Sequence, residues 1–97
     1  MRVFVDDQRP APSGWTLARN ADEAIAMLRR GNVEELSLDY DLGDPSFGTG
    51  SDVLDWLELA LAENRTSLPR LHAHSGSPLG RRRLETHIAL IEARFGR

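Results

Sequence analysis

Side chains that can take part in chemistry follow three of the strands that the sequence predicts, at the point where each strand ends. These residues are, in chain order, Asp6, Asp7, Asp39, Asp41, His74 and Ser75. In open α/β sheets ligands bind outside the carboxyl ends of the strands, so these side chains are expected to share one site. The alternative is that each aspartate merely ends a strand and begins a turn.

The four aspartates could hold a metal ion. Close carboxylates repel one another by about 1 kcal/mol per pair in water, and by more at a lower effective dielectric. They must therefore bind a cation, pair with arginine or share a proton. Oxygen ligands carried on loops suit Mg²⁺, which needs few carboxylates and keeps several of its waters. The predicted ligands of such a Mg²⁺ site are Asp6, Asp7, Asp39 and Asp41.

The segment His72–Ser75 places two imidazoles on one face of a strand, because side chains alternate along it. Such a pair could bind zinc, or one histidine could act as a general acid or base. His74, at the strand exit, is the better candidate, whereas His72 is equally well explained as a core histidine with its hydrogen bonds satisfied. Ser75 could donate a hydrogen bond to a phosphate oxygen or be a turn residue. No nucleophile-elbow sequence surrounds it, which argues against a Ser–His–Asp triad.

Three consecutive arginines lie near the N-terminus of the last predicted helix, after residues 77–80. Arginine there opposes the helix macrodipole, and a bound anion would relieve the conflict, since helix N-termini and guanidinium groups both bind phosphate. Another arginine lies in the loop after the first strand. The predicted phosphate ligands are Arg9, Arg81, Arg82 and Arg83. Without a ligand, one of the three helical arginines is expected to pair with an acid of residues 41–44. The alternative is that all three arginines are simply solvated on the surface.

The composition excludes several kinds of chemistry. The 97 residues contain no cysteine and no lysine, which excludes disulfides, cysteine nucleophiles, Schiff-base lysines and P-loop lysines. Residues 1–63 carry 13 acids and 5 arginines, whereas residues 64–97 carry 7 arginines and 2 glutamates. This asymmetry favours an acidic pocket beside a basic rim, without strong binding of double-stranded DNA. No apolar run approaches the roughly 18 residues of a membrane span, and no signal peptide is visible. We expect one cytoplasmic domain, residues 1–97, that is a monomer or a weak dimer.

Strands and helices alternate in the predicted order of elements. The predicted strands are Arg2–Asp6, Trp15–Arg19, Glu35–Asp39 and Arg70–His74, and the helices follow the capping residues Asn20, Thr49 and Ser77. This order predicts a mostly parallel sheet with helices on its faces. Residues 7–14 join the first two strands without a helix, and could span about 25 Å against about 17 Å for a five-residue strand. An irregular parallel crossover is therefore feasible, and an antiparallel pair is the alternative.

Four sequence blocks in this order carry a resemblance to a known family. They are VDDQRPAP, SLDYDLG, GTGSDVLDWL and HAHSGSPLGRRRLE. Over nearly its full length the chain resembles the cyclic-phosphate processing receiver-like domain, a divergent relative of the response-regulator receiver. The resemblance implies a flavodoxin-like, three-layer α/β/α fold with strand order 2-1-3-4 and a loop in place of the first helix. It also implies an acidic site of Asp6, Asp7 and Asp39, with Asp41, His74 and Ser75 close by.

The resemblance implies a metal-assisted phosphoesterase that opens or removes the cyclic phosphate at the end of RNA or of a nucleotide. Asp39, His74 and Ser75 are the expected catalytic residues, with His74 transferring a proton. An ordinary receiver has a fifth strand bearing a lysine, and this chain has no lysine and no room for that strand, which argues against phosphorelay. Gly76 stands where the narrower family often has asparagine. The alternative is a non-catalytic receiver-like binding or signalling module, whose Asp39 could accept a phosphoryl group.

Overall fold

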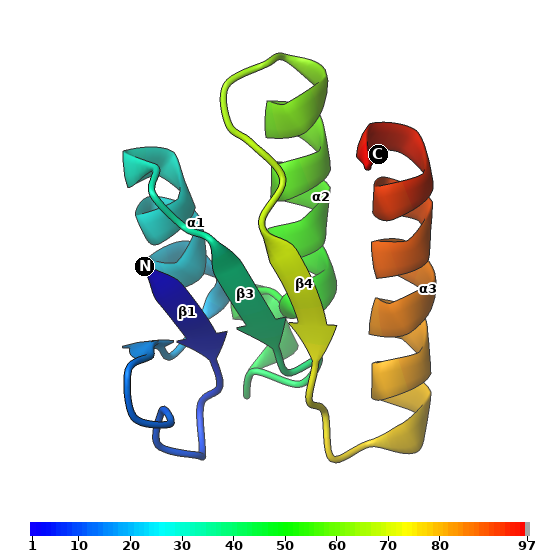
Figure 1. The fold of residues 1–97 in the computed structure, drawn as a ribbon. Helices are drawn as coiled ribbons and strands as arrows, with labels where there is room; N and C mark the ends of the chain where they lie inside the picture. The colour runs from blue at the N-terminus through cyan, green and yellow to red at the C-terminus, as the bar shows by residue number, and fades with distance from the viewer. Residues whose placement is uncertain (97) are drawn as a thin grey trace.

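Four strands form one parallel sheet in the computed structural model, which describes residues 1–96 (Figure 1). The strands are β1 (Arg2–Val5), β2 (Thr16–Ala18), β3 (Glu35–Leu38) and β4 (Arg70–Ala73). Their order is β2-β1-β3-β4, and all three neighbouring pairs are parallel. The predicted strand order is thus confirmed, and the antiparallel alternative for the first pair is wrong. The crossover between β1 and β2 contains no helix, as the two prolines of that loop predicted.

The helices begin at the capping residues that the sequence indicates. They are α1 (Ala21–Arg30), α2 (Gly50–Ala62) and α3 (Pro78–Phe95), with a short 3₁₀ turn, η1 (Pro45–Phe47), before α2. Asn20 accepts the N–H of Glu23, Thr49 and Asp52 form a capping box, and the Ser77 hydroxyl accepts the N–H of Gly80. None of these helices, in the part of the chain that the structure describes, is long and apolar enough to cross a membrane.

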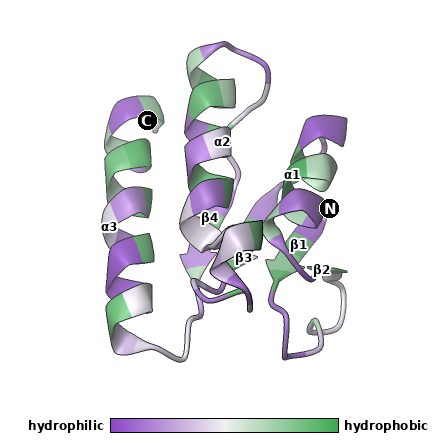
Figure 2. Ribbon diagram, turned by 180° about the vertical axis from the view of Figure 1, so that it is seen from behind, coloured by the Kyte–Doolittle hydropathy of each residue, from purple (hydrophilic) through white to green (hydrophobic). Residues whose placement is uncertain are grey.

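All three helices pack on the same face of the sheet. One contiguous cluster joins apolar side chains of the strands with those of every helix; its members include Val3, Val5, Leu36, Leu38, Leu71, Leu28, Leu54, Leu57, Leu84 and Ile91. The strand members alternate in sequence, so they point to one side only. Seen from behind, α1 and α2 lie in front of the strands, the reverse of the first view (Figure 2).

The opposite face of the sheet differs from the predicted three-layer arrangement. It carries the other strand positions, Arg2, Phe4, Glu35, Ser37, Arg70 and His72, and no helix within residues 1–96 packs over them. The physical reason is the handedness of the crossovers. The step from β1 to β2 runs in the opposite direction to the later steps, so a right-handed helix there would cover this face. A loop replaces that helix, and the face stays open.

Candidate functional site

Three of the predicted residues converge at the carboxyl edge of the sheet. Asp6, Asp39 and His74 each bring one ligand atom into a group whose atoms all lie within 4.8 Å of one another. They directly follow β1, β3 and β4, which are neighbours in the sheet and are paired in register. Asp6 is buried, at 1 % exposure, whereas Asp39 and His74 are partly exposed. The site therefore has a covered carboxylate at its base and two side chains that a ligand can reach.

His74 is held by hydrogen bonds at both ring nitrogens. Its Nε2 lies 3.0 Å from Oδ2 of Asp6, and its Nδ1 lies 2.7 Å from Oγ of Ser37. The ring of Phe4 stacks on the imidazole, with centroids 4.1 Å apart and planes inclined by 6°. One neutral tautomer satisfies both contacts, with Nε2–H donating to the carboxylate and Nδ1 accepting from the hydroxyl. The ring is thus fixed in position and orientation.

Sequence reasoning missed Ser37 and Phe4. Side-chain alternation does place Ser37 on the same face as Asp39, and Phe4 on the same face as Asp6. Whether either residue meets His74 depends on the register between β1, β3 and β4 and on the reach of the side chains. The pattern of residues in one strand does not determine that register.

The Asp6 carboxylate is ionised in spite of its burial. Burial raises the pKa of Asp6, but the backbone N–H groups of Arg9 and Gln8, donating to Oδ1 at 2.9 and 2.8 Å, and the contact with His74 together hold that pKa below its ordinary value. For His74, burial lowers the pKa, and the attraction of Asp6 and Asp39 only partly opposes this. Near neutral pH the site therefore pairs a buried carboxylate with a neutral imidazole.

The donor set fits a divalent cation. Asp6 and Asp39 offer carboxylate oxygens, and Mg²⁺ needs only one or two protein carboxylates beside its waters. His74, hydrogen-bonded to Asp6, would then orient that carboxylate. Direct ligation by the His74 nitrogen would instead suit a transition metal such as Zn²⁺.

Asp7 and Asp41 lie outside this group and beside the loop at Gly43. The Asp7 carboxylate accepts from Nε2 of Gln8 at 3.2 Å, and its Oδ2 would lie 3.3 Å from a Cβ at Gly43. The Asp41 carboxylate accepts the N–H of Gly43 at 3.2 Å. Two of the four predicted metal ligands thus form the group with His74, and the other two flank the neighbouring loop.

Ser75 lies between the strand edge and the first turn of α3. Its side chain is buried, and its Oγ accepts the N–H of Ser77 at 3.2 Å. A Cβ at Gly80 would lie only 3.2 Å from this Oγ and 2.8 Å from Cβ of Tyr40. The absence of a side chain at Gly80 is therefore what lets α3 begin directly against the site.

The predicted phosphate ligands occupy two different positions. Arg9 donates from Nη1 to the carbonyl oxygen of His74 at 3.4 Å, so its guanidinium lies at the site edge. The three arginines of α3 are exposed, and Arg82 and Arg83 line a hollow of about 440 Å³ beside Tyr40. An anion at the site would thus have Arg9 close by, whereas the hollow at Arg82 and Arg83 is lined by Tyr40, Ser51, Leu79 and Thr86.

The predicted ion pair between the α3 arginines and the loop acids is wrong. Among residues 1–96 none of the three forms a salt bridge, and Arg83 instead donates to Oη of Tyr40 at 3.2 Å. The physical reason is local: Asp41 and Asp44 accept backbone N–H groups of their own loop. Close packing of Gly80 on Tyr40 brings the phenol to the arginine.

The two shifted pKa values at this site predict a loss of stability in acid. The folded pKa of His74 is below its unfolded value, so its contribution is complete above about pH 6.5 and is lost as the pH falls toward the folded pKa. The contribution of Asp6 is complete above about pH 4 and is lost as the pH falls through its lowered pKa. We expect the free energy of unfolding to fall by at most about 1.4 kcal/mol per pH unit for each proton taken up.

Urea unfolding followed by circular dichroism, in EDTA and from pH 7.5 down to about pH 2, measures this dependence. In the variant His74→Gln, the free energy of unfolding should no longer change between pH 7 and 5. It should still fall below about pH 4, where Asp6 takes up its proton. Equal slopes for both proteins between pH 7 and 5 would contradict the assignment to His74.

Comparison with known proteins agrees with the fold. The family model of the cyclic-phosphate processing receiver domain matches residues 1–89, which include every residue of the site and the α3 arginines. Searches of curated proteins and of solved structures returned no match. The match confirms the resemblance carried by the four sequence blocks, and the strand order and helix-free first crossover agree with it. This chain belongs to the family of cyclic-phosphate processing receiver domains.

Proposed function

We propose that this domain is a phosphoesterase that opens or removes the terminal cyclic phosphate of an RNA or of a nucleotide. The observation that carries the proposal is the convergence of Asp6, Asp39 and His74 at one edge of the sheet. Two carboxylates and a neutral imidazole are groups that can bind a cation and move a proton beside a phosphate ester. Membership of a family of cyclic-phosphate processing domains indicates that the substrate carries a cyclic phosphate.

The carboxylates supply the electrostatic part of this function. Asp39 is partly exposed and Asp6 is buried, and their carboxylates lie close enough for both to offer oxygens to one Mg²⁺. A bound Mg²⁺ would polarise the phosphoryl group and lower the pKa of a coordinated water. The N–H groups of Gln8 and Arg9 keep Asp6 charged and in place.

His74 supplies the proton-transfer part. Its Nε2–H is committed to Asp6, and Nδ1, facing the hydroxyl of Ser37, is the basic atom. A proton taken up at Nδ1 would form an imidazolium that Asp6 and Asp39 stabilise. Burial holds the pKa of His74 below its ordinary value, so the ring is neutral near pH 7 and able to accept that proton.

Arginine and serine groups would receive the phosphate. Arg9 lies at the site edge, and Arg81, Arg82 and Arg83 follow near the start of α3. These groups can neutralise charge on phosphate oxygens. Ser75 keeps a hydroxyl proton that is available to an oxygen, since its Oγ only accepts in its contact with Ser77.

A direct assay tests the proposal. The purified protein is incubated with each 2′,3′-cyclic nucleotide in Mg²⁺ or in EDTA, and linear phosphate products are separated by chromatography. We expect product in Mg²⁺ and much less in EDTA. Binding of the cyclic nucleotides without any product under either condition would overturn the enzymatic proposal, and would favour a receiver-like binding module.

A further inference from the structure

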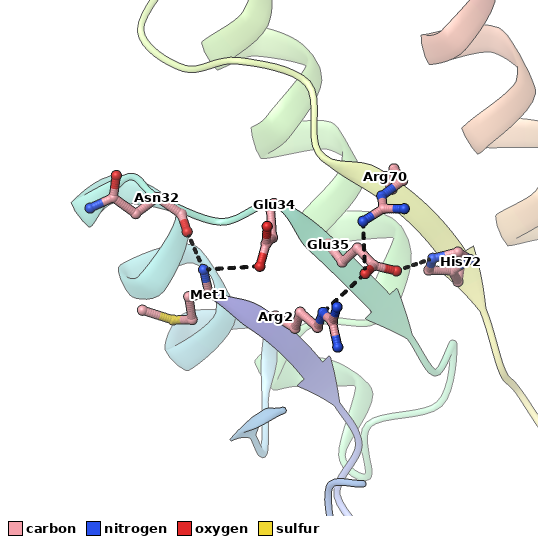
Figure 3. A network of polar contacts seen from close by, with 7 residues as sticks. All are labelled: Met1, Arg2, Asn32, Glu34, Glu35, Arg70 and His72. Carbon is pink, nitrogen blue, oxygen red and sulfur yellow. Dashed lines mark hydrogen bonds and ion pairs between the residues drawn. The ribbon is translucent and has the colours of Figure 1, made fainter. Parts of the chain in front are cut away.

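A charged cluster lies at the far end of the open sheet face, away from the candidate site (Figure 3). Its four residues, here called the open-face cluster, are Arg2, Glu35, Arg70 and His72. Oε1 of Glu35 lies 3.1 Å from Nε of Arg2 and 3.2 Å from Nη2 of Arg70, and Oε2 lies 2.9 Å from Nε2 of His72. One carboxylate thus faces two permanent cations and an imidazole, and the cluster keeps an excess of positive charge.

The cationic members of the open-face cluster are the accessible ones. The side chains of Arg2, Arg70 and His72 are 46 %, 70 % and 50 % exposed, whereas that of Glu35 is 12 % exposed. Arg2 uses Nε in its contact with Glu35, and its terminal nitrogens lie outside that contact (Figure 3). The surface presented to solvent is therefore positive and able to donate hydrogen bonds.

The open-face cluster lies on the same face of the sheet as the candidate site. Side-chain alternation puts Arg70, His72 and His74 on one face of β4, and the register pairs Glu35 of β3 with Arg70. His74 lies four positions after Arg70, which is about 13 Å along a strand. A mononucleotide with its phosphate at His74 has no second phosphate to place at Arg70. A polynucleotide carries one phosphate per nucleotide and can occupy both positions.

We propose that the substrate is a single-stranded RNA whose end lies at Asp39 and His74 and whose preceding nucleotides bind along the open sheet face. This inference rests on the proposed function and names its substrate class. Phosphates of the preceding nucleotides contact Arg2 and Arg70, and the exposed His72 ring offers a surface on which a base stacks. A 2′,3′-cyclic phosphate requires a 2′-hydroxyl, so the polymer end is RNA. The proposed function, and not the cluster alone, selects a nucleic acid over an acidic protein segment as the ligand.

Binding of a labelled RNA tests the inference. The probe is a fluorescent RNA of about six nucleotides that ends in a 2′,3′-cyclic phosphate, followed by anisotropy in EDTA. The variant Arg2→Gln/Arg70→Gln should weaken its binding by about tenfold and make the slope of log K against log salt shallower by about 1.4. Affinity for a 2′,3′-cyclic mononucleotide should change by less than about twofold.

A matched control removes the same charge from the other side of the molecule. Arg29 and Arg65 lie over the ring of Trp56 on the helical side, and Arg29→Gln/Arg65→Gln should leave RNA binding unchanged. Because the double open-face variant leaves Glu35 with fewer partners, the single variant Arg70→Gln serves as a second test. Arg70 is mostly exposed, so its removal should preserve the fold and change the salt slope by about 0.7.

Two outcomes overturn this inference: RNA that binds no more tightly than the mononucleotide, or a control variant that loses as much affinity as Arg2→Gln/Arg70→Gln. Failure of the proposed function looks different, because it appears as a lack of turnover of cyclic nucleotides by the unmodified protein. Arginine-dependent RNA binding without turnover would leave the open-face inference standing and remove only the catalytic proposal.

Discussion

Replacing Asp39 by asparagine should slow hydrolysis of a 2′,3′-cyclic nucleotide by at least about a hundredfold. Asp39 is the more exposed carboxylate of the group with Asp6 and His74, whose ligand atoms lie within 4.8 Å of one another. Asparagine keeps the shape of the side chain but removes the charge that would hold Mg²⁺ and stabilise a protonated His74. The loss should therefore appear in kcat, with little change in the free energy of unfolding.

Initial rates over a range of substrate and Mg²⁺ concentrations measure this effect. His74→Gln should lower kcat by a similar factor, because it removes the basic Nδ1 while keeping hydrogen-bonding atoms next to Asp6. Glu63→Gln, at the C-cap of α2, is the control that removes one acid at the end of the helix away from the carboxyl edge of the sheet (Figure 1). An Asp39→Asn protein with more than half the original kcat would show that the chemistry lies elsewhere.

The fold was predictable because each element carries a local signal. Three of the four strands are short runs followed directly by aspartate or histidine. The helices begin at Asn20, Thr49 and Ser77, whose side chains accept backbone N–H groups. The helix-free crossover followed from the prolines of residues 7–14. These signals act over a few residues, so the local sequence is enough to identify them.

Local signals of this kind do not predict the open sheet face or the hydrogen bonds of His74. A loop in place of the first helix leaves one face uncovered, and the polar residues Arg2, Glu35 and Arg70 at alternating strand positions are the sequence signal for it. The contact between Ser37 and His74 depends on strand register and on side-chain geometry to within a few tenths of an ångström. Neither quantity is specified by a single strand.

The second large effect is expected at the start of α2, where Gly50→Ala should destabilise the protein by about 3 kcal/mol. A Cβ at Gly50 would lie 2.3 Å from the carbonyl oxygen of Asp39 and 3.2 Å from Cδ2 of Leu84. The N–H of Gly50 also donates to the carbonyl oxygen of Tyr40 at 2.9 Å, so helix and strand end are held together at this point. Neither backbone can move away without breaking that contact.

The sign of this effect separates close packing from helix propensity. Glycine to alanine in an exposed helix stabilises by up to about 1 kcal/mol, so propensity alone predicts the opposite result at Gly50. Gly76→Ala is the matched control, because the nearest atom to its new Cβ is the mobile Nη2 of Arg9 at 3.5 Å, and its effect should stay within about 0.5 kcal/mol. Urea unfolding of both variants measures the difference.

Gly50→Ala also tests whether the position of Asp39 depends on this junction. If α2 moves away from the end of β3, the backbone of Asp39 loses the contact with Gly50 that holds it in place. Its carboxylate then leaves the group with Asp6 and His74. Activity per folded molecule should then fall together with stability. An alanine variant as stable as the original protein would mean that the junction relaxes at little cost. In that case the close approach of Gly50 to Asp39 would not be what positions the carboxylate.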